Sequence, residues 1–275
     1  MNVPDLLERI QEVCPLPATA QRVAQLAGDP KTRIDQIAAI LATDPALTAE
    51  VMRIANSAAF GRSRQIAELE QAVLLIGAAQ IHDMALAMGM LAAFRTKAEL
   101  SFNFHDRAVV AGSIARGLAE KVGISDKSEM FVCGLLSEIG AMACAVVDAT
   151  EYARLCQQAP DFAQREELER KRYQATTREI GGRLLRRNGL PESVARTIEA
   201  DSTAPNAGLR ERVAGFARRA AGTILQVGKS GDVAALAERV GALRDELRLE
   251  VPAKDVVDTC MQAAGAALAA LRQAR

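Results

Sequence analysis

Apolar residues recur along most of this chain at intervals of three and four positions, the spacing that places them on one face of an α-helix. Strict alternation of apolar and polar residues, which is the pattern of a half-buried strand, is scarce. The pattern predicts an all-α protein with a multi-helix fold that is not a simple bundle. The expected helices cover residues 5–13, 19–27, 32–41, 45–58, 68–76, 81–94, 104–122, 129–139, 141–147, 151–158, 165–172, 178–187, 192–200, 209–227, 233–247 and 254–271.

Punctuating residues predict where several of these helices begin and end. Thr32, with Asp35 three positions later, is expected to cap one helix, and Thr177 is expected to cap another. Gly140 is expected to break or kink the chain between two helices. The segment 165–172 is dense in charges of both signs, which is typical of a solvated helix face.

The apolar pattern is interrupted by charged and polar residues near positions 95–103. We therefore expect an N-terminal helical subdomain over residues 1–98, packed on a second helical subdomain over residues 99–275. The most apolar window, residues 81–94, is apolar nearly all round, so it should be buried on most sides. It is too short to span a bilayer, and small residues such as Gly89 should let another helix approach it closely.

The run 44–61 carries the most informative local pattern. Asp44 is a good N-cap, and Pro45 suits the first helical position because its missing N–H costs nothing there. The polar pair Asn56 and Ser57 is unusual inside a helix. It indicates either side chains that brace a neighbouring segment or a frayed helix end. The candidate structural or interaction residues of this run are Asp44, Pro45, Asn56, Ser57, Phe60 and Gly61.

Composition narrows the classes of function. The 275 residues include 34 Lys and Arg and 34 Asp and Glu, so the balance of charge gives no overall reason to bind nucleic acid or an anionic membrane. The five cysteines, an odd number without a C-x-x-C pair, are typical of reduced thiols and not of disulfides or a zinc site. No secretory signal pattern precedes the first helix. We expect a cytoplasmic protein with no cofactor and no membrane contact.

The run 44–61 also carries a resemblance. Its D-P-x-L and A-N-S-x-x-x-G motifs, together with Leu16-Pro17 upstream and Ile76-Gly77 downstream, resemble the signature of the HDOD (HD-related output domain) family. The resemblance implies a non-catalytic bacterial regulatory module. Such a module contacts other signalling proteins, for example as the output region of a two-component or cyclic-di-GMP pathway.

The second half of the chain resembles the HD superfamily of metal-dependent phosphohydrolases. The resemblance implies that His105 matches a lone metal-binding histidine, and that Ser137 and Glu138 replace the His-Asp doublet of the G-L-L-H-D-I-G motif. The sequence contains only one other histidine, His82, which lies outside the matching segment. A site that needs several imidazoles cannot be assembled from these residues. We therefore expect a degenerate site without metal and without catalysis.

Two other functions stay open. The segments 32–41 and 45–58 could imitate a helix-turn-helix, but Arg53 is the only basic residue of the second, and a DNA-reading helix needs basic residues along its phosphate-facing side. Nucleic-acid binding would rely on better basic patches, formed by Arg183, Arg186 and Arg187 and by Arg210, Arg212, Arg218 and Arg219. A residual HD-type phosphohydrolase would require added metal and His105.

Overall fold

The computed structural model describes residues 3–29, 31–56, 66–102, 104–159, 162–227 and 233–273, and these residues form helices and connecting turns without a strand. The prediction of an all-α fold is confirmed. The first helices are α1 (Val3–Val13), α2 (Ala18–Ala27), α3 (Ile34–Leu41), α4 (Pro45–Ala55), α5 (Leu69–Ile76) and α6 (Ala78–Phe102). They are followed by α7 (Phe104–Lys121), α8 (Lys127–Leu135), α9 (Ile139–Val147), α10 (Ala149–Gln158), α11 (Phe162–Tyr173), α12 (Thr177–Arg187), α13 (Glu192–Glu199), α14 (Leu209–Val227), α15 (Val233–Glu246) and α16 (Ala253–Gln273).

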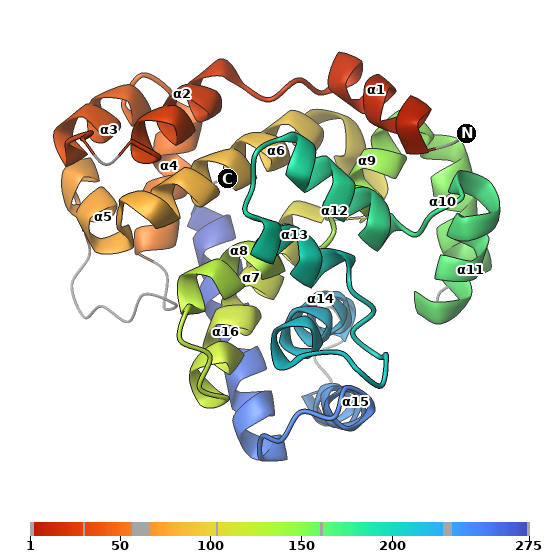
Figure 1. Ribbon diagram of the computed structural model, residues 1–275. Coiled ribbons are helices and arrows are strands. Elements are labelled where there is room, and N and C mark those ends of the chain that lie inside the picture. The colour runs from red at the N-terminus through yellow and green to blue at the C-terminus, as the bar shows by residue number, and fades with distance from the viewer. Residues whose placement is uncertain are drawn as a thin grey trace.

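Two long helices, α6 and α7, form the centre of the fold (Figure 1). Helix α6 packs against α2, α4 and α5 and also against α8 and α9, whereas α7 is covered by α8, α14 and α16. Residues 84–91 of α6 are all buried. A helix that is apolar on all sides must be covered on all sides, so this segment can only lie in the interior. Its Gly89 lets α2 approach, because a Cβ there would collide with Ala20.

The first helix lies apart from α2–α5 and packs on α9 and α12 (Figure 1). Leu6 and Ile10 of α1 are fully buried. Helix α1 is therefore attached to the core of the C-terminal half, although it belongs to the expected range 1–98. Helix α6 runs unbroken to Phe102 and packs on both halves. The boundary near residue 98 stays a prediction.

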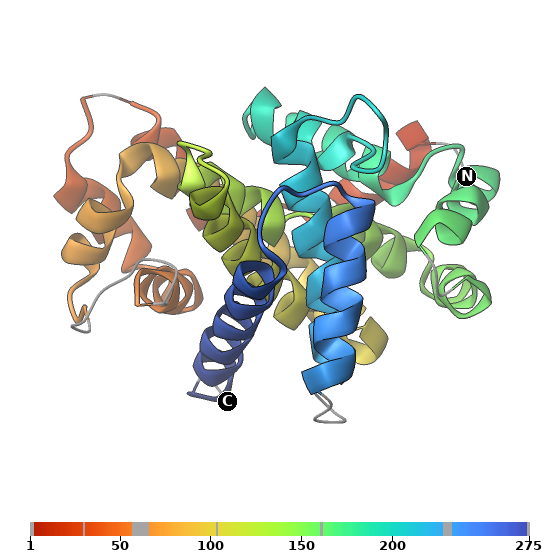
Figure 2. The ribbon, with the colours of Figure 1, turned by 90° about the horizontal axis from the view of Figure 1, so that it is seen from below.

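The last three helices stand along one side of the molecule (Figure 2). Helix α15 packs against α14, and α16 packs against α7 and also contacts α14 and α15. Helix α14 has the bounds that the sequence pattern predicts. In this arrangement α14 packs against α7 and forms one wall of the site described below.

The prediction that Gly140 separates two helices is wrong. Helix α8 ends at Leu135 and α9 begins at Ile139, so the break lies at residues 136–138 and Gly140 is inside α9. The reason is tertiary packing: a Cβ at residue 140 would overlap the carbonyl oxygen of Thr177 at the start of α12. Glycine is present here because two helices cross in close contact, and not because the chain bends.

Two predicted caps are also wrong. The N-cap of α12 is Thr176, one residue earlier than predicted; its hydroxyl accepts from Glu179 N (3.2 Å), and the Glu179 carboxylate accepts from Thr176 N (2.9 Å). Helix α3 begins after Arg33 and not after Thr32. The N–H of Arg33 donates to the Gln36 side chain (3.0 Å), so Gln36 supplies the contact that the sequence had assigned to Asp35.

One stretch of the described residues, Lys127–Val147, is long and apolar enough to cross a membrane, and 89% of its most apolar window is buried inside the protein. Helix α5 and the segment Gln80–Phe94 pass the same test only as a pair, and they are bent by 111°. Core helices of a globular fold have the same composition, because they are also surrounded by apolar groups.

Candidate functional site

The degenerate HD position lies at the buried turn between α8 and α9, which holds Ser137 and Glu138. Both side chains are nearly inaccessible to solvent. The hydroxyl of Ser137 donates to the carbonyl oxygen of Gly134 at 2.7 Å, so it serves the end of its own helix. The carboxylate of Glu138 points away from this turn to a partner on α7.

That partner is Arg107, whose guanidinium donates to the buried Glu138 carboxylate and forms a largely buried ion pair with it. The same guanidinium lies 5.9 Å from the ring centroid of Phe104. His105, which the resemblance assigns to the site, lies two positions earlier on α7. Residues two positions apart project about 200° apart around an α-helix. Arg107 and His105 therefore point to different sides of the helix.

Arg107 is a site residue that the sequence analysis missed. No local signal marks it, because a single arginine near the start of a helix is usually solvated. It is recognised only when α7 and the α8–α9 turn are brought together, 31 residues apart in the chain.

Further charged groups lie on α11, α12 and α14, and several of them are buried. Glu166 accepts two hydrogen bonds from Arg178, at 2.6 and 2.8 Å. Glu169 is 1% exposed and accepts from the backbone N–H of Thr177 (2.8 Å) and from its hydroxyl (3.2 Å). Burial raises the pKa of Glu169 to about 6, although the hydrogen bonds from Thr177 act in the other direction. The predicted solvated face of segment 165–172 therefore contains one buried carboxyl group.

These residues do not fit a divalent metal. Among the residues that the structure describes, no group of three or more His, Cys, Asp or Glu side chains is placed to hold one. The carboxylate at the doublet position is already neutralised by Arg107. The Arg107 guanidinium would repel a metal cation at this position. The Ser137 hydroxyl, which donates its hydrogen bond to a backbone carbonyl, is a poor metal ligand.

Three fully buried thiols offer no alternative nucleophile. Burial raises the pKa of Cys133 and of Cys260 to about 12, and it raises the pKa of Cys144 well above its ordinary value. A thiol must lose its proton to attack a substrate. These three groups therefore stay protonated and unreactive near neutral pH.

The run 44–61 is described as far as Asn56; Ser57, Phe60 and Gly61 lie outside the described residues. Asp44 accepts from Leu47 N at 3.0 Å, and Pro45 is the first residue of α4, as predicted. The Asn56 side chain accepts from the N–H of Ile66 (2.7 Å) and donates to its carbonyl (2.9 Å). Asn56 thus braces the chain ten residues further on. A role of this run in partner contact stays a prediction.

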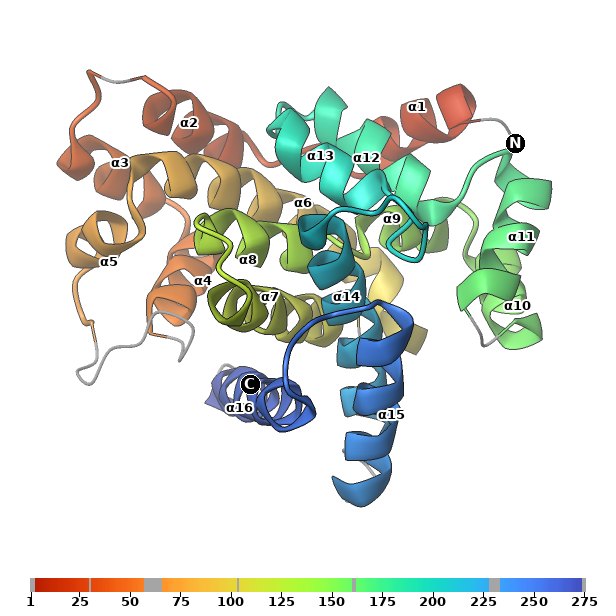
Figure 3. The same cartoon turned by 60° about the horizontal axis from the view of Figure 1, so that its bottom comes forward.

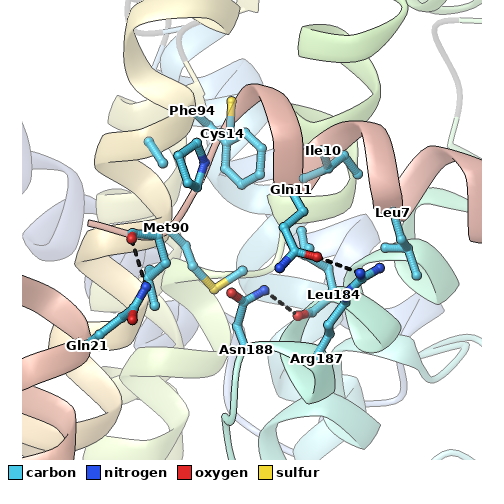
Figure 4. Close-up of a pocket in the computed structure, with 13 residues that line it drawn as sticks. Leu7, Ile10, Gln11, Cys14, Gln21, Met90, Phe94, Leu184, Arg187 and Asn188 are labelled. Carbon is cyan, nitrogen blue, oxygen red and sulfur yellow. Dashed lines mark hydrogen bonds between the residues drawn. The ribbon is translucent and has the colours of Figure 1, made fainter. Parts of the chain in front are cut away.

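A second feature is a cavity of about 130 Å³ between α1, α6 and α12 (Figure 4). Its polar side chains are engaged within the protein: Gln11 accepts from Arg187, and the side-chain amide of Asn188 donates to the carbonyl of Leu184 (2.8 Å). The remaining wall is mostly apolar and includes Met90 and Phe94. The sequence pattern did not reveal this cavity, because three distant segments form it.

Comparison with known proteins places the chain in a family. The sequence profile of the HDOD domain matches residues 13–204, which is well over half of the chain. The chain therefore belongs to the HDOD domain family, as the motifs of the run 44–61 predicted.

Among solved structures, the chain is similar to a protein from Shewanella amazonensis SB2B that is named a candidate phosphohydrolase, with 19% identity, a TM-score of 0.72 and coverage of 96% of this chain and 97% of that one. It is also similar to a protein from Marinobacter aquaeolei VT8 that is named a candidate signal transduction protein, with 19% identity, a TM-score of 0.61 and coverage of 98% of this chain and 62% of that one. Identities this low show a shared fold.

A curated relative, an uncharacterized protein of Treponema pallidum (strain Nichols), is 24% identical over 204 residues. The match covers 74% of this chain and 40% of the relative, so the chain spans about two fifths of the length of that protein.

Proposed function

We propose that the chain is a non-catalytic regulatory module of bacterial signalling that acts through contacts with other proteins. The observation that supports this most directly is the buried ion pair between Arg107 and Glu138. It replaces the metal-binding doublet that a phosphohydrolase of the HD type requires. A protein that neutralises this carboxylate with a guanidinium uses the position to hold helices together and not to activate water.

Two further observations support the proposal. A structural relative with nearly full coverage of this chain is named for signal transduction. Two of the arginines that would serve nucleic-acid binding are engaged within the protein: Arg186 pairs with Glu192, and Arg219 pairs with Glu246. Arginines paired in this way cannot neutralise phosphates without losing their partners.

The first arm of the test is a phosphodiesterase assay. Hydrolysis of bis(p-nitrophenyl) phosphate is measured after addition of Mn²⁺ or Fe²⁺, for the wild-type protein and for the Glu138→Ala and His105→Ala variants. The expected result is no metal-dependent turnover in any of them. Turnover in the wild type that either substitution abolishes would overturn the proposal.

The second arm measures the contact itself. A signalling protein that co-purifies with the tagged chain from its own bacterium is purified and titrated against the chain by calorimetry. We expect saturable binding that a chelator does not change, since the contact needs no metal. Binding that disappears on chelation would contradict a metal-free interaction module.

A further inference from the structure

A cavity of about 500 Å³ opens between α11, α12 and α14. In Figure 3, α12 lies above α14, and α11 stands to the right of both. A much smaller cavity, of about 10 Å³, leads inward to Ser137 at the α8–α9 turn. Arg178, Ser202 and Arg218 line both cavities, so the two meet at these three residues.

The feature that points to a ligand is the side chain of Arg218. It is only 9% exposed, and its Nε has no hydrogen-bond partner among the described residues. The distance from its Nη2 to the carboxylate of Glu166 is 3.8 Å, beyond hydrogen-bond length. Both oxygens of Glu166 already accept from Arg178, so this carboxylate is held by another guanidinium.

The other arginines of the wall are paired with carboxylates. Arg219 donates to both oxygens of Glu246 at 2.7 Å, and Arg170 donates to Glu179 at 2.9 Å. Arg218 differs from them: its ion pair with Glu166 is long, and its guanidinium lies 4.9 Å from the ring centroid of Phe162 instead of donating to a carboxylate at hydrogen-bond length. Burial of a guanidinium without hydrogen-bonded acceptors lowers the stability of the fold. A guanidinium kept in such a position is therefore a candidate for ligand binding.

Electrostatics agrees with this geometry. Burial lowers the pKa of the Arg218 guanidinium, although Glu138 and Glu166 act in the other direction. The surrounding carboxylates thus do not fully compensate the cost of burying this cation. An anion beside Arg218 would supply the missing compensation.

We propose that this cavity binds a small organic anion, whose phosphate or carboxylate oxygens accept hydrogen bonds from the guanidinium of Arg218 and from the hydroxyl of Ser202. A planar guanidinium matches the geometry of such oxyanions with two parallel hydrogen bonds. The volume exceeds that of a bare ion and lies in the range of small-molecule sites. The site needs no metal, and it stands whether or not the proposed function is correct.

The test is calorimetric titration with phenyl phosphate and with benzoate, at neutral pH and constant ionic strength. We expect saturable binding of at least one probe by the wild-type protein. Arg218→Gln should raise the Kd by about tenfold or more, because the charge-assisted hydrogen bonds are lost. The matched control is Arg154→Gln, which removes an exposed arginine paired with Glu151 on α10 and should leave the Kd unchanged.

Thermal unfolding without ligand separates binding from a structural role. If Arg218 serves a ligand, Arg218→Gln should melt at the same temperature as the wild type or higher, because an uncompensated buried charge has been removed. Arg218→Lys is the second variant: it keeps the charge but cannot donate two parallel bonds, so it should fold and bind more weakly.

The two probes also distinguish the source of the anion. Tighter binding of phenyl phosphate assigns the site to phosphate esters, and tighter binding of benzoate assigns it to carboxylates. The proposal is overturned if neither probe binds saturably at millimolar concentrations, or if the wild type and both Arg218 variants bind equally well.

Discussion

Glu169 is a carboxyl group buried under α12, and its pKa makes the stability of the protein depend on pH. Its pKa rises from 4.5 in the unfolded chain to about 6 in the fold, mainly because burial disfavours the charged form. The folded protein therefore binds more protons than the unfolded one between these two values. The free energy of unfolding should fall by about 2 kcal/mol as the pH rises through this interval.

Glu169→Gln isolates this contribution, because the amide oxygen can still accept from Thr177 N. Relative to the wild type, the variant should gain about 2 kcal/mol of stability between pH 4 and pH 7. Urea unfolding at a series of pH values measures the difference in stability between the two proteins. The contributions of all other titrating groups are the same in both proteins and cancel in this difference. Parallel curves for the two proteins would show that Glu169 keeps an ordinary pKa.

At the scale of elements, the pair of Arg107 and Glu138 ties α7 to the α8–α9 turn. Arg107→Met or Glu138→Leu alone leaves one charge buried without its partner and should cost about 3 kcal/mol. The double variant buries neither charge, so it should recover most of the loss. Equilibrium unfolding of all four proteins gives the coupling energy between the two residues.

An exposed pair on α10 provides the control for this cycle. Arg154 and Glu151 are three residues apart, and the arginine side chain is 52% exposed. Glu151→Ala should leave stability almost unchanged, because solvent screens such pairs. If substitutions in the buried pair lower stability no more than Glu151→Ala does, the α8–α9 turn is held by packing alone.

The contact between α9 and α12 depends on Gly140. A methyl group at this position would overlap the Thr177 carbonyl, so Gly140→Ala should cost about 3 kcal/mol or more of stability. Gly241 on α15 is the matched control, since a Cβ there meets nothing within 4 Å. Gly241→Ala should stabilise the protein by about 1 kcal/mol through helix propensity. Thermal melts of the two variants should therefore shift in opposite directions.

These elements also show what a sequence pattern can and cannot supply. The helices themselves were predictable because apolar spacing is local, and so was the N-cap at Asp44. The role of Gly140 was not, because it is decided by the carbonyl of Thr177 on another helix. Arg107 was missed for the same reason, since its burial depends on a turn 31 residues away.

At the scale of the whole molecule, the place of α1 was the least predictable feature. Its amphipathic pattern identifies the buried face but not the surface that covers it. In the fold, α1 lies apart from α2–α5, which follow it in the sequence, and packs on α9 and α12 (Figure 1). The cavity of Figure 4 lies at this contact, and its walls come from segments that are up to 181 residues apart, from Leu7 to Asn188.

If this docking is part of the stable fold, Leu6→Ala should cost about 3 kcal/mol, because Leu6 is completely buried. Leu74→Ala is the control: the same atoms are removed from a side chain on α5 that is 66% exposed, and stability should change by less than about 0.5 kcal/mol. Hydrogen exchange should rise in α9 and α12 of the Leu6 variant and stay unchanged in α3 and α5. Equal costs for the two variants, with no change in exchange, would mean that α1 rests on the core without stabilising it. A large loss of stability, with increased hydrogen exchange only in α9 and α12, would show that α1 stabilises the C-terminal half of the fold.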